Sequence, residues 1–173
     1  MNAVEIFNPD GTQLATPELM RQKVVALQDE LLQAPQADIV TMHTFLPGVY
    51  ERKITVPPWT VLTGAAHKTG YRVRLEKGTI AVNRETEVVV LTAPFEFDAK
   101  AGEQRAGRVF DEEVVWVDIY DNPDDCQDLD VLEDRLYVVP ECGLGDARKR
   151  LALKNEIESV KELPWPDGQQ PQS

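Results

Sequence analysis

Cysteine and histidine are scarce in this sequence of 173 residues, which contains two of each. Cys126 and Cys142 lack CxxC spacing, and we interpret them as reduced thiols, with a disulfide between them as the alternative. With His43 and His67 as the two histidines, a metal site would need carboxylates to complete it. The phosphate-binding glycine loop, HExxH and GxSxG are also missing, so most common enzyme signatures are absent.

A positive charge balance is missing as well, since 30 Asp and Glu residues outnumber 18 Lys and Arg residues, for a formal net charge of −12. A protein with this balance lacks the basic surface that nucleic acid binding needs, and we expect no nucleic acid partner. The stretch between Asp111 and Asp134 holds eleven acids and no Lys or Arg. We interpret it as a solvated acidic face, with docking on a basic protein surface as the alternative.

Long hydrophobic runs are absent too, and no segment is apolar enough over a sufficient length to cross a bilayer. The first residues show neither a basic region nor an apolar leader, so we expect no signal peptide and no membrane partner. The chain length predicts one domain built around a single core.

The N-terminal region, residues 1–37, combines a short strand at residues 4–7 with a helix. Thr16 is a suitable N-cap, and Pro17 suits the first helical position. Apolar residues then recur at helical spacing, which predicts a helix over Pro17–Gln33. Its apolar stripe needs a partner, either the barrel of its own chain or a neighbouring subunit.

Alternating polar and apolar residues, broken by Gly and Pro turns, predict many short strands in residues 38–122. This pattern is typical of a β-sandwich or barrel. Residues 123–163 form an acidic segment with a short helix near Leu129 to Leu136 and a second helix at residues 144–160, and residues 164–173 are a polar tail that we expect to be flexible. The predicted strands are residues 39–45, 49–56, 60–62, 71–76, 79–83, 87–92, 95–98, 105–110 and 114–120.

One glycine-containing segment includes Gly64, His67 and Gly78, and a second runs from Lys100-Ala101-Gly102 to Arg105. These two segments resemble the paired motifs of the cupin (RmlC-like jelly-roll) superfamily. Residues 47–57, 62–64, 67–69 and 102–107 resemble, more narrowly, small cupin-like proteins of tailed bacteriophages. The resemblance covers about residues 41–133, and it implies a mainly β, cupin-like jelly-roll barrel with an N-terminal helix and one or two C-terminal helices.

The sequence departs from the cupin motif at the metal ligands. If His67 occupies the first ligand position, the second falls on Thr69, the acid position on Val73 or Arg74, and the histidine of the second motif on Arg105. Strand alternation also places Glu76 on the face opposite His67, unless a bulge at Gly70 reverses the parity. We therefore expect no metal cofactor, with a divalent metal as the less favoured alternative.

The remaining site hypothesis is a metal-free cavity lined by His43, His67, Tyr71 and Arg105, which would suit an anionic or sugar-like ligand. Alternatively, His67 is a structural residue at the barrel rim and Arg105 pairs with Glu103 or Asp98. The resemblance favours a non-catalytic bacteriophage protein with a structural or interaction role in or around the virion. Its partners would be copies of itself or other virion proteins, in the host cytoplasm or the virion. The alternative is a small-molecule-binding cupin or an isomerase-like enzyme.

Overall fold

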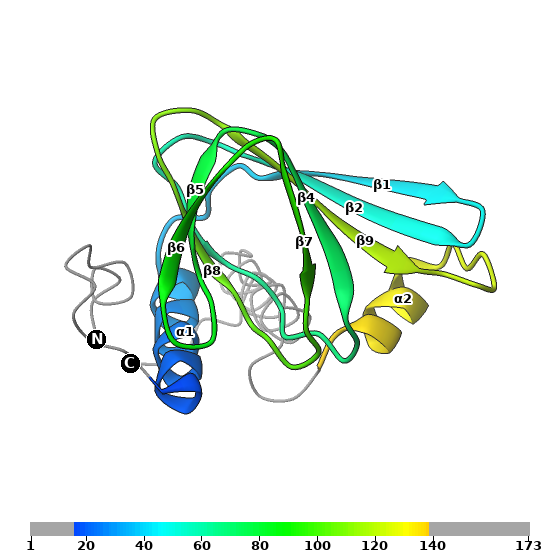
Figure 1. Ribbon diagram of the computed structural model, residues 1–173, viewed down its shortest axis with the longest axis horizontal. Helices are drawn as coiled ribbons and strands as arrows, with labels where there is room; N and C mark the ends of the chain where they lie inside the picture. Colours follow the sequence, from blue (N-terminus) through cyan, green and yellow to red (C-terminus); the bar gives the residue numbers. More distant parts are fainter. Residues whose placement is uncertain (1–15, 139–173) are drawn as a thin grey trace, which may run out of the picture.

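The computed structural model describes residues 16–138, and these form two antiparallel sheets and two helices (Figure 1). Five strands make the first sheet and four make the second. The first sheet contains β1 (Val40–Leu46), β2 (Val49–Val56), β4 (Tyr71–Lys77), β7 (Phe95–Ala99) and β9 (Val114–Asp121). The second contains β3 (Val61–Thr63), β5 (Thr79–Asn83), β6 (Val88–Thr92) and β8 (Ala106–Val109).

The strand order identifies the fold as a jelly roll. The sheets have the orders β1-β2-β9-β4-β7 and β3-β8-β5-β6, and all pairs are antiparallel. Apart from the extra edge strand β1, the chain crosses between the sheets at each step except the β5–β6 hairpin, which gives the paired Greek keys of a jelly roll. The predicted mainly β jelly-roll class is thus confirmed.

Most predicted elements match the observed ones within one or two residues. The predicted strands 49–56 and 79–83 coincide with β2 and β5. The strands β4, β6, β7 and β9 differ from the prediction by one residue at one end, and β1, β3 and β8 differ by one residue at both ends. Helix α1 (Pro17–Gln33) has the predicted bounds, and α2 (Leu129–Leu136) is the predicted short helix. The predicted strand 4–7, the helix 144–160, the tail and Cys142 lie outside the described residues.

Strand alternation sorts β4 into an inner and an outer face. Tyr71, Val73 and Leu75 are buried between the sheets, whereas Arg72 and Glu76 are exposed. The pairing of β4 with β9 shifts register between Leu75 and Lys77, beyond the inward-facing residues, so this irregularity does not turn Glu76 inward. Glu76 instead pairs with Lys53 on the outer face, at 2.7 Å.

Helix α1 packs on the barrel of its own chain. Its buried residues Met20, Val24 and Leu27 form a second apolar cluster with Ala81 and Ala106 of the four-stranded sheet. Thr16 accepts a hydrogen bond from the Leu19 amide at 3.2 Å, which caps the helix as predicted. Neither described helix is long and apolar enough to span a membrane.

The acids between Asp111 and Asp134 do not form one uniform face. Asp118 is buried inside the barrel, whereas Asp128 caps α2 by accepting from two backbone amides. Asp124 forms a two-pronged ion pair with Arg135 at 2.8 and 2.9 Å. The run of acids in the sequence is therefore divided among local structural roles and one buried position.

Candidate functional site

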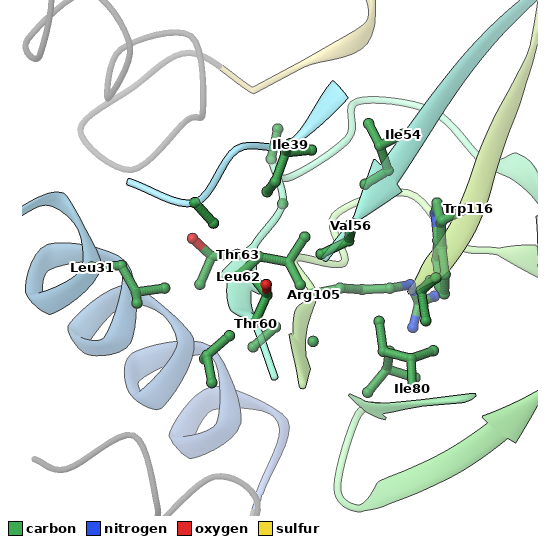
Figure 2. Close-up of a pocket in the computed structure, with 18 of the residues that line it drawn as sticks. Leu31, Ile39, Ile54, Val56, Thr60, Leu62, Thr63, Ile80, Arg105 and Trp116 are labelled. Atoms are coloured by element: carbon green, nitrogen blue, oxygen red, sulfur yellow. The ribbon is translucent and has the colours of Figure 1, made fainter. Parts of the chain in front are cut away.

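A cavity of about 700 Å³ extends between the two sheets and out to α1. Figure 2 shows Arg105 reaching into it toward Trp116, with Val56 and Ile80 close by and Leu31 contributed by α1. The volume is within the usual range of small-molecule sites. The polar side chains lining the cavity include Gln28, Arg52, His67, Tyr71, Arg105, Asp118 and Tyr137.

His67 lies just before β4 rather than within it. As predicted, β4 begins at Tyr71, so the uninterrupted strand from His67 on which the parity argument for Glu76 depended does not form, and His67 makes an isolated bridge with Tyr137. Its ring stacks on Tyr71 with 3.9 Å between centroids, and its Nε2 lies 2.8 Å from the Tyr120 hydroxyl. The side chain still lines the cavity, with its ring against that of Tyr71.

Burial keeps His67 neutral. The loss of solvent, followed by the charges of Arg105 and Arg52, lowers its pKa to about 3, with a small opposing effect from the backbone of Ala65. Its Nδ1 is buried and makes no hydrogen bond of standard geometry within the described residues. His67 therefore presents an uncharged imidazole nitrogen to the site, one that can donate or accept according to its tautomer.

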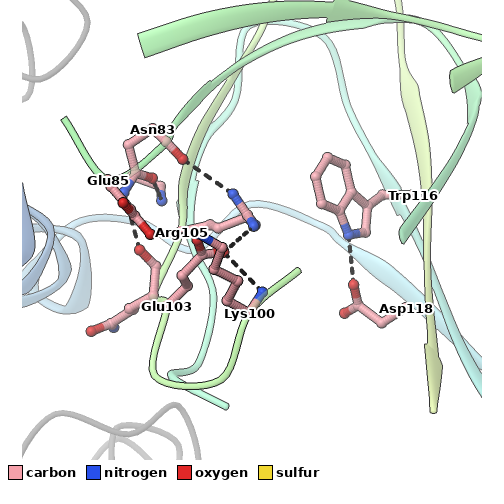
Figure 3. Close-up of polar contacts among 9 residues, drawn as sticks. Asn83, Glu85, Lys100, Glu103, Arg105, Trp116 and Asp118 are labelled. Carbon is pink, nitrogen blue, oxygen red and sulfur yellow. Dashed lines mark hydrogen bonds and ion pairs between the residues drawn. The ribbon is translucent and has the colours of Figure 1, made fainter. Parts of the chain in front are cut away.

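Arg105 lies just before β8, and Glu103 and the Asn83 carbonyl hold its guanidinium from two sides. Its Nη2 contacts Glu103 Oε2 at 2.5 Å, and its Nη1 donates to the Asn83 carbonyl at 3.2 Å (Figure 3). The guanidinium also lies 4.9 Å from the centroid of the Phe97 ring. Its Nε is buried without a hydrogen-bond partner among the described residues. The predicted pairing with Glu103 is confirmed, whereas Asp98 pairs with Arg72 at 3.6 Å.

Sequence reasoning missed Arg52, Asp118 and Tyr137 as site residues. Arg52 on β2 and Asp118 on β9 are directly paired in register, so their side chains share the inner face. Tyr137 reaches the site from the segment after α2 through its bridge to His67. The alternation of residues in β2 places Arg52 on the same face as Ile54 and Val56, and this pattern was the signal in the sequence that could have identified Arg52 as an inward-facing residue.

Asp118 is a buried carboxylate whose negative charge is partly compensated by neighbouring groups. Trp116 Nε1 donates to its Oδ1 at 2.8 Å, and the guanidinium of Arg52 lies 4.0 Å from its Oδ2 (Figure 3 shows the Trp116 contact). Burial raises its pKa, and the neighbouring charge of Arg52 and the hydrogen bonds from Trp116 and Tyr120 oppose that shift. It faces the cavity beside two arginines, so the polar end is close to electrically balanced.

The structure brings together three of the four predicted site residues. His67, Tyr71 and Arg105 line the main cavity, whereas His43 is exposed on β1 and lines a separate pocket of about 210 Å³ beside α2. Its Nδ1 lies 2.7 Å from the Tyr50 hydroxyl. His43 faces the same side as its paired residue Arg52, but β1 is the outermost strand, so its ring does not reach the main cavity.

The residues at the cupin ligand positions do not fit a metal ion. Thr69 is exposed, Arg74 forms ion pairs on the outer face, and Arg105 places a cation where the resemblance expects a histidine. Within residues 16–138, no three His, Cys, Asp or Glu side chains are grouped so that they could hold a metal.

No family model and no curated protein matches the chain, whereas many solved structures are similar to it. One is the cupin domain of a transcriptional regulator from Enterobacter cloacae, with 15% identity, a TM-score of 0.43, and coverage of 49% of this chain and 95% of that one. A second is KdgF from Halomonas sp., with 14% identity, a TM-score of 0.43, and coverage of 52% and 85%. A third is a cupin superfamily protein from Desulfitobacterium hafniense, with 9% identity, a TM-score of 0.42, and coverage of 51% and 81%. These similarities concern the fold over about half of the chain.

Proposed function

We propose that this protein binds a small organic carboxylate in its barrel cavity without converting it chemically. One observation carries the proposal. Three buried nitrogens make no hydrogen bond of standard geometry among the described residues, although the Ala65 backbone makes a weaker polar contact with His67 and the Tyr71 hydroxyl one with Arg105. The three atoms are His67 Nδ1, Arg105 Nε and Gln28 Nε2. All three belong to side chains that line the same cavity.

Buried donors without partners are unfavourable, and each costs about 1–3 kcal/mol unless a ligand or water satisfies it. A carboxylate supplies acceptors only, so its oxygens can accept from Arg105 Nε and, in the tautomer that protonates Nδ1, from His67. Arg105 keeps its Nε available while Glu103 and Asn83 fix the rest of the guanidinium, so this donor is held in position before a ligand arrives.

The electrostatics favour binding over acid–base catalysis. A general acid or base works best when its pKa lies near the working pH. The pKa of His67 is instead lowered to about 3, and burial raises the pKa of Tyr71 well above its ordinary value, with smaller effects from Asp118 and Arg105. Neither side chain is tuned for the proton transfers that an isomerase-like reaction would need.

A thermal denaturation series with acetate, butyrate, glutarate, gluconate and inorganic phosphate tests the proposal. We expect at least one carboxylate to stabilise the wild type, since a ligand at 100 times its Kd contributes about 2.7 kcal/mol. Arg105→Ala and His67→Ala should lose this shift. Arg72→Ala is the matched control, because Arg72 is exposed on the outer face of β4 and should leave the shift intact. A wild type that responds to no carboxylate at millimolar concentration contradicts the proposal.

We also propose a second function, the interaction role in or around a bacteriophage virion that the resemblance implies, with copies of this chain as partners. The supporting observation is β1, an edge strand whose outward residues Val40, Met42 and Leu46 are 59%, 58% and 46% exposed. An antiparallel pair of β1 strands centred on His43 would set Val40 against Leu46 of the second copy. Light scattering on the wild type and on Met42→Lys tests it: a monomeric wild type at high concentration refutes this second function.

A further inference from the structure

Trp59 occupies a backbone conformation that a tryptophan rarely adopts. Its φ angle is +60°, in the left-handed region that disfavours residues with a Cβ atom. The conformation is fixed from both sides, because the Trp59 amide donates to the Phe110 carbonyl and the Val109 amide donates to the Thr60 carbonyl, both at 2.8 Å. Glycine or asparagine would suit this turn position better.

Core packing does not compensate for that conformation. The Trp59 side chain is 69% exposed, which makes it the most exposed large hydrophobic residue of the described chain. It nevertheless lines the same cavity as Arg105. A residue that both lines a cavity and remains largely exposed lies at the opening, so the left-handed turn places an indole at the cavity entrance.

Trp59 and Arg105 line this cavity from points near the two ends of β8. The Trp59 amide donates a hydrogen bond to the carbonyl of Phe110, which lies just after β8. Arg105 lies just before β8, and its carbonyl accepts a hydrogen bond from the Gly64 amide. The strand β8 lies between the two points, and the five steps from Arg105 to Phe110 span about 16 Å at about 3.3 Å per residue. A ligand that contacts both ends must therefore be elongated.

Between the two points, branched aliphatic side chains from both sheets line much of the cavity, with Thr60 and Thr63 among them. The charged side chains of the lining are Arg52, Arg105 and Asp118. A ligand that matches this lining has a carboxylate head, an aliphatic middle and a flat group at the far end. The aliphatic residues are Ile54, Val56, Leu62, Ile80 and Val114.

We propose that Trp59 is a specificity-determining residue whose indole stacks on a flat ring at the far end of an elongated monocarboxylate. This inference rests on the proposed carboxylate-binding function and names the ligand class more closely. The ring contributes through face-to-face or edge contacts with the indole, and the aliphatic middle contributes through burial. The unfavourable left-handed conformation of Trp59 then has a role, because it holds the indole over the cavity opening.

Titration calorimetry with a series of ω-phenylalkanoates, from phenylacetate to 6-phenylhexanoate, tests the inference, with butyrate as the ligand that lacks a ring. We expect affinity to rise by about fourfold for each added methylene, the equivalent of burying one methylene. Trp59→Asn, which tolerates the left-handed turn, should weaken 6-phenylhexanoate binding at least about fivefold, the effect of losing one stacked ring. The same variant should bind butyrate as the wild type does and unfold at an equal or higher temperature.

Two further variants make the outcomes distinct. Trp59→Phe retains an aromatic face and should keep 6-phenylhexanoate affinity within about threefold of the wild type. Arg105→Ala should lose butyrate and 6-phenylhexanoate alike. If Trp59→Asn binds 6-phenylhexanoate as tightly as the wild type, the Trp59 inference is wrong while carboxylate binding stands. If the wild type binds none of these acids, both fail.

Discussion

The buried neutral His67 makes a specific contribution to the pH dependence of folding, and His67→Phe isolates it. Phenylalanine preserves the flat ring that stacks on Tyr71 but cannot take up a proton. It loses the hydrogen bond to Tyr120, so the variant will be less stable at every pH. The informative quantity is therefore the slope of stability against pH, compared between the two proteins.

The sign follows from the lowered pKa. The imidazole has its ordinary pKa of 6.5 in the unfolded chain and a pKa of about 3 in the folded protein, so the unfolded state binds more protons between these values. Lowering the pH through 6.5 toward 3 therefore favours unfolding. Between pH 7.5 and pH 5 the loss amounts to about 2 kcal/mol. Because His67 is only 5% exposed, solvent screening takes little from this value.

Urea denaturation at pH 7.5, 6.5, 5.5 and 5.0 measures the slopes. The wild type should lose about 2 kcal/mol more than His67→Phe over this range, since the carboxylates are common to both proteins. Asp118 acts in the opposite direction, because its pKa is raised in the folded state, and it too is present in both. Equal slopes for the wild type and His67→Phe would refute the assignment of His67 as buried and neutral.

Two further predictions concern the framework of the site. Gly78→Ala should destabilise the protein by about 3 kcal/mol in urea denaturation, because φ is +82° and the added Cβ would overlap the Glu113 carbonyl oxygen and lie 2.9 Å from Val114 Cγ2. Gly48→Ala, with φ +71° and no atom within 4 Å, should cost about 1 kcal/mol, and equal losses would contradict the steric argument. Asp128→Ala should cost about 1 kcal/mol through the lost N-cap of α2, and no change in the urea midpoint would show that this cap does not stabilise the native state.

Local signals in the sequence were sufficient for most of the fold. Thr16 and Pro17 define the start of α1, and strand alternation correctly placed Glu76 outside the barrel. The glycine-containing segments brought His67 and Arg105 to one cavity, as the resemblance implied. These features depend on neighbouring residues or on short motifs, which a single sequence displays directly.

The remaining site residues depend on long-range pairing. Arg52 meets Asp118 because β2 and β9, far apart in the sequence, pair in one particular register. Tyr137 pairs with His67 although it follows α2 in the sequence and is separated from His67 by most of the barrel strands. His43 shows the converse, because its strand parity was compatible with the barrel interior but its strand is the outermost of the sheet. Neither a register nor the position of a strand within a sheet is visible in local patterns.

The sign of the charge at one inward position accounts for the chemistry that this barrel favours. A metal site needs neutral imidazoles and carboxylates around an open centre, and a neighbouring guanidinium opposes cation binding. Arg105 occupies the position where a ligand histidine would be expected, and Glu103 and the Asn83 carbonyl hold it there. Its charge also contributes to keeping His67 neutral. The residue that stands in place of a metal ligand thus supplies a fixed donor, which opposes a bound cation and supports the carboxylate-binding proposal.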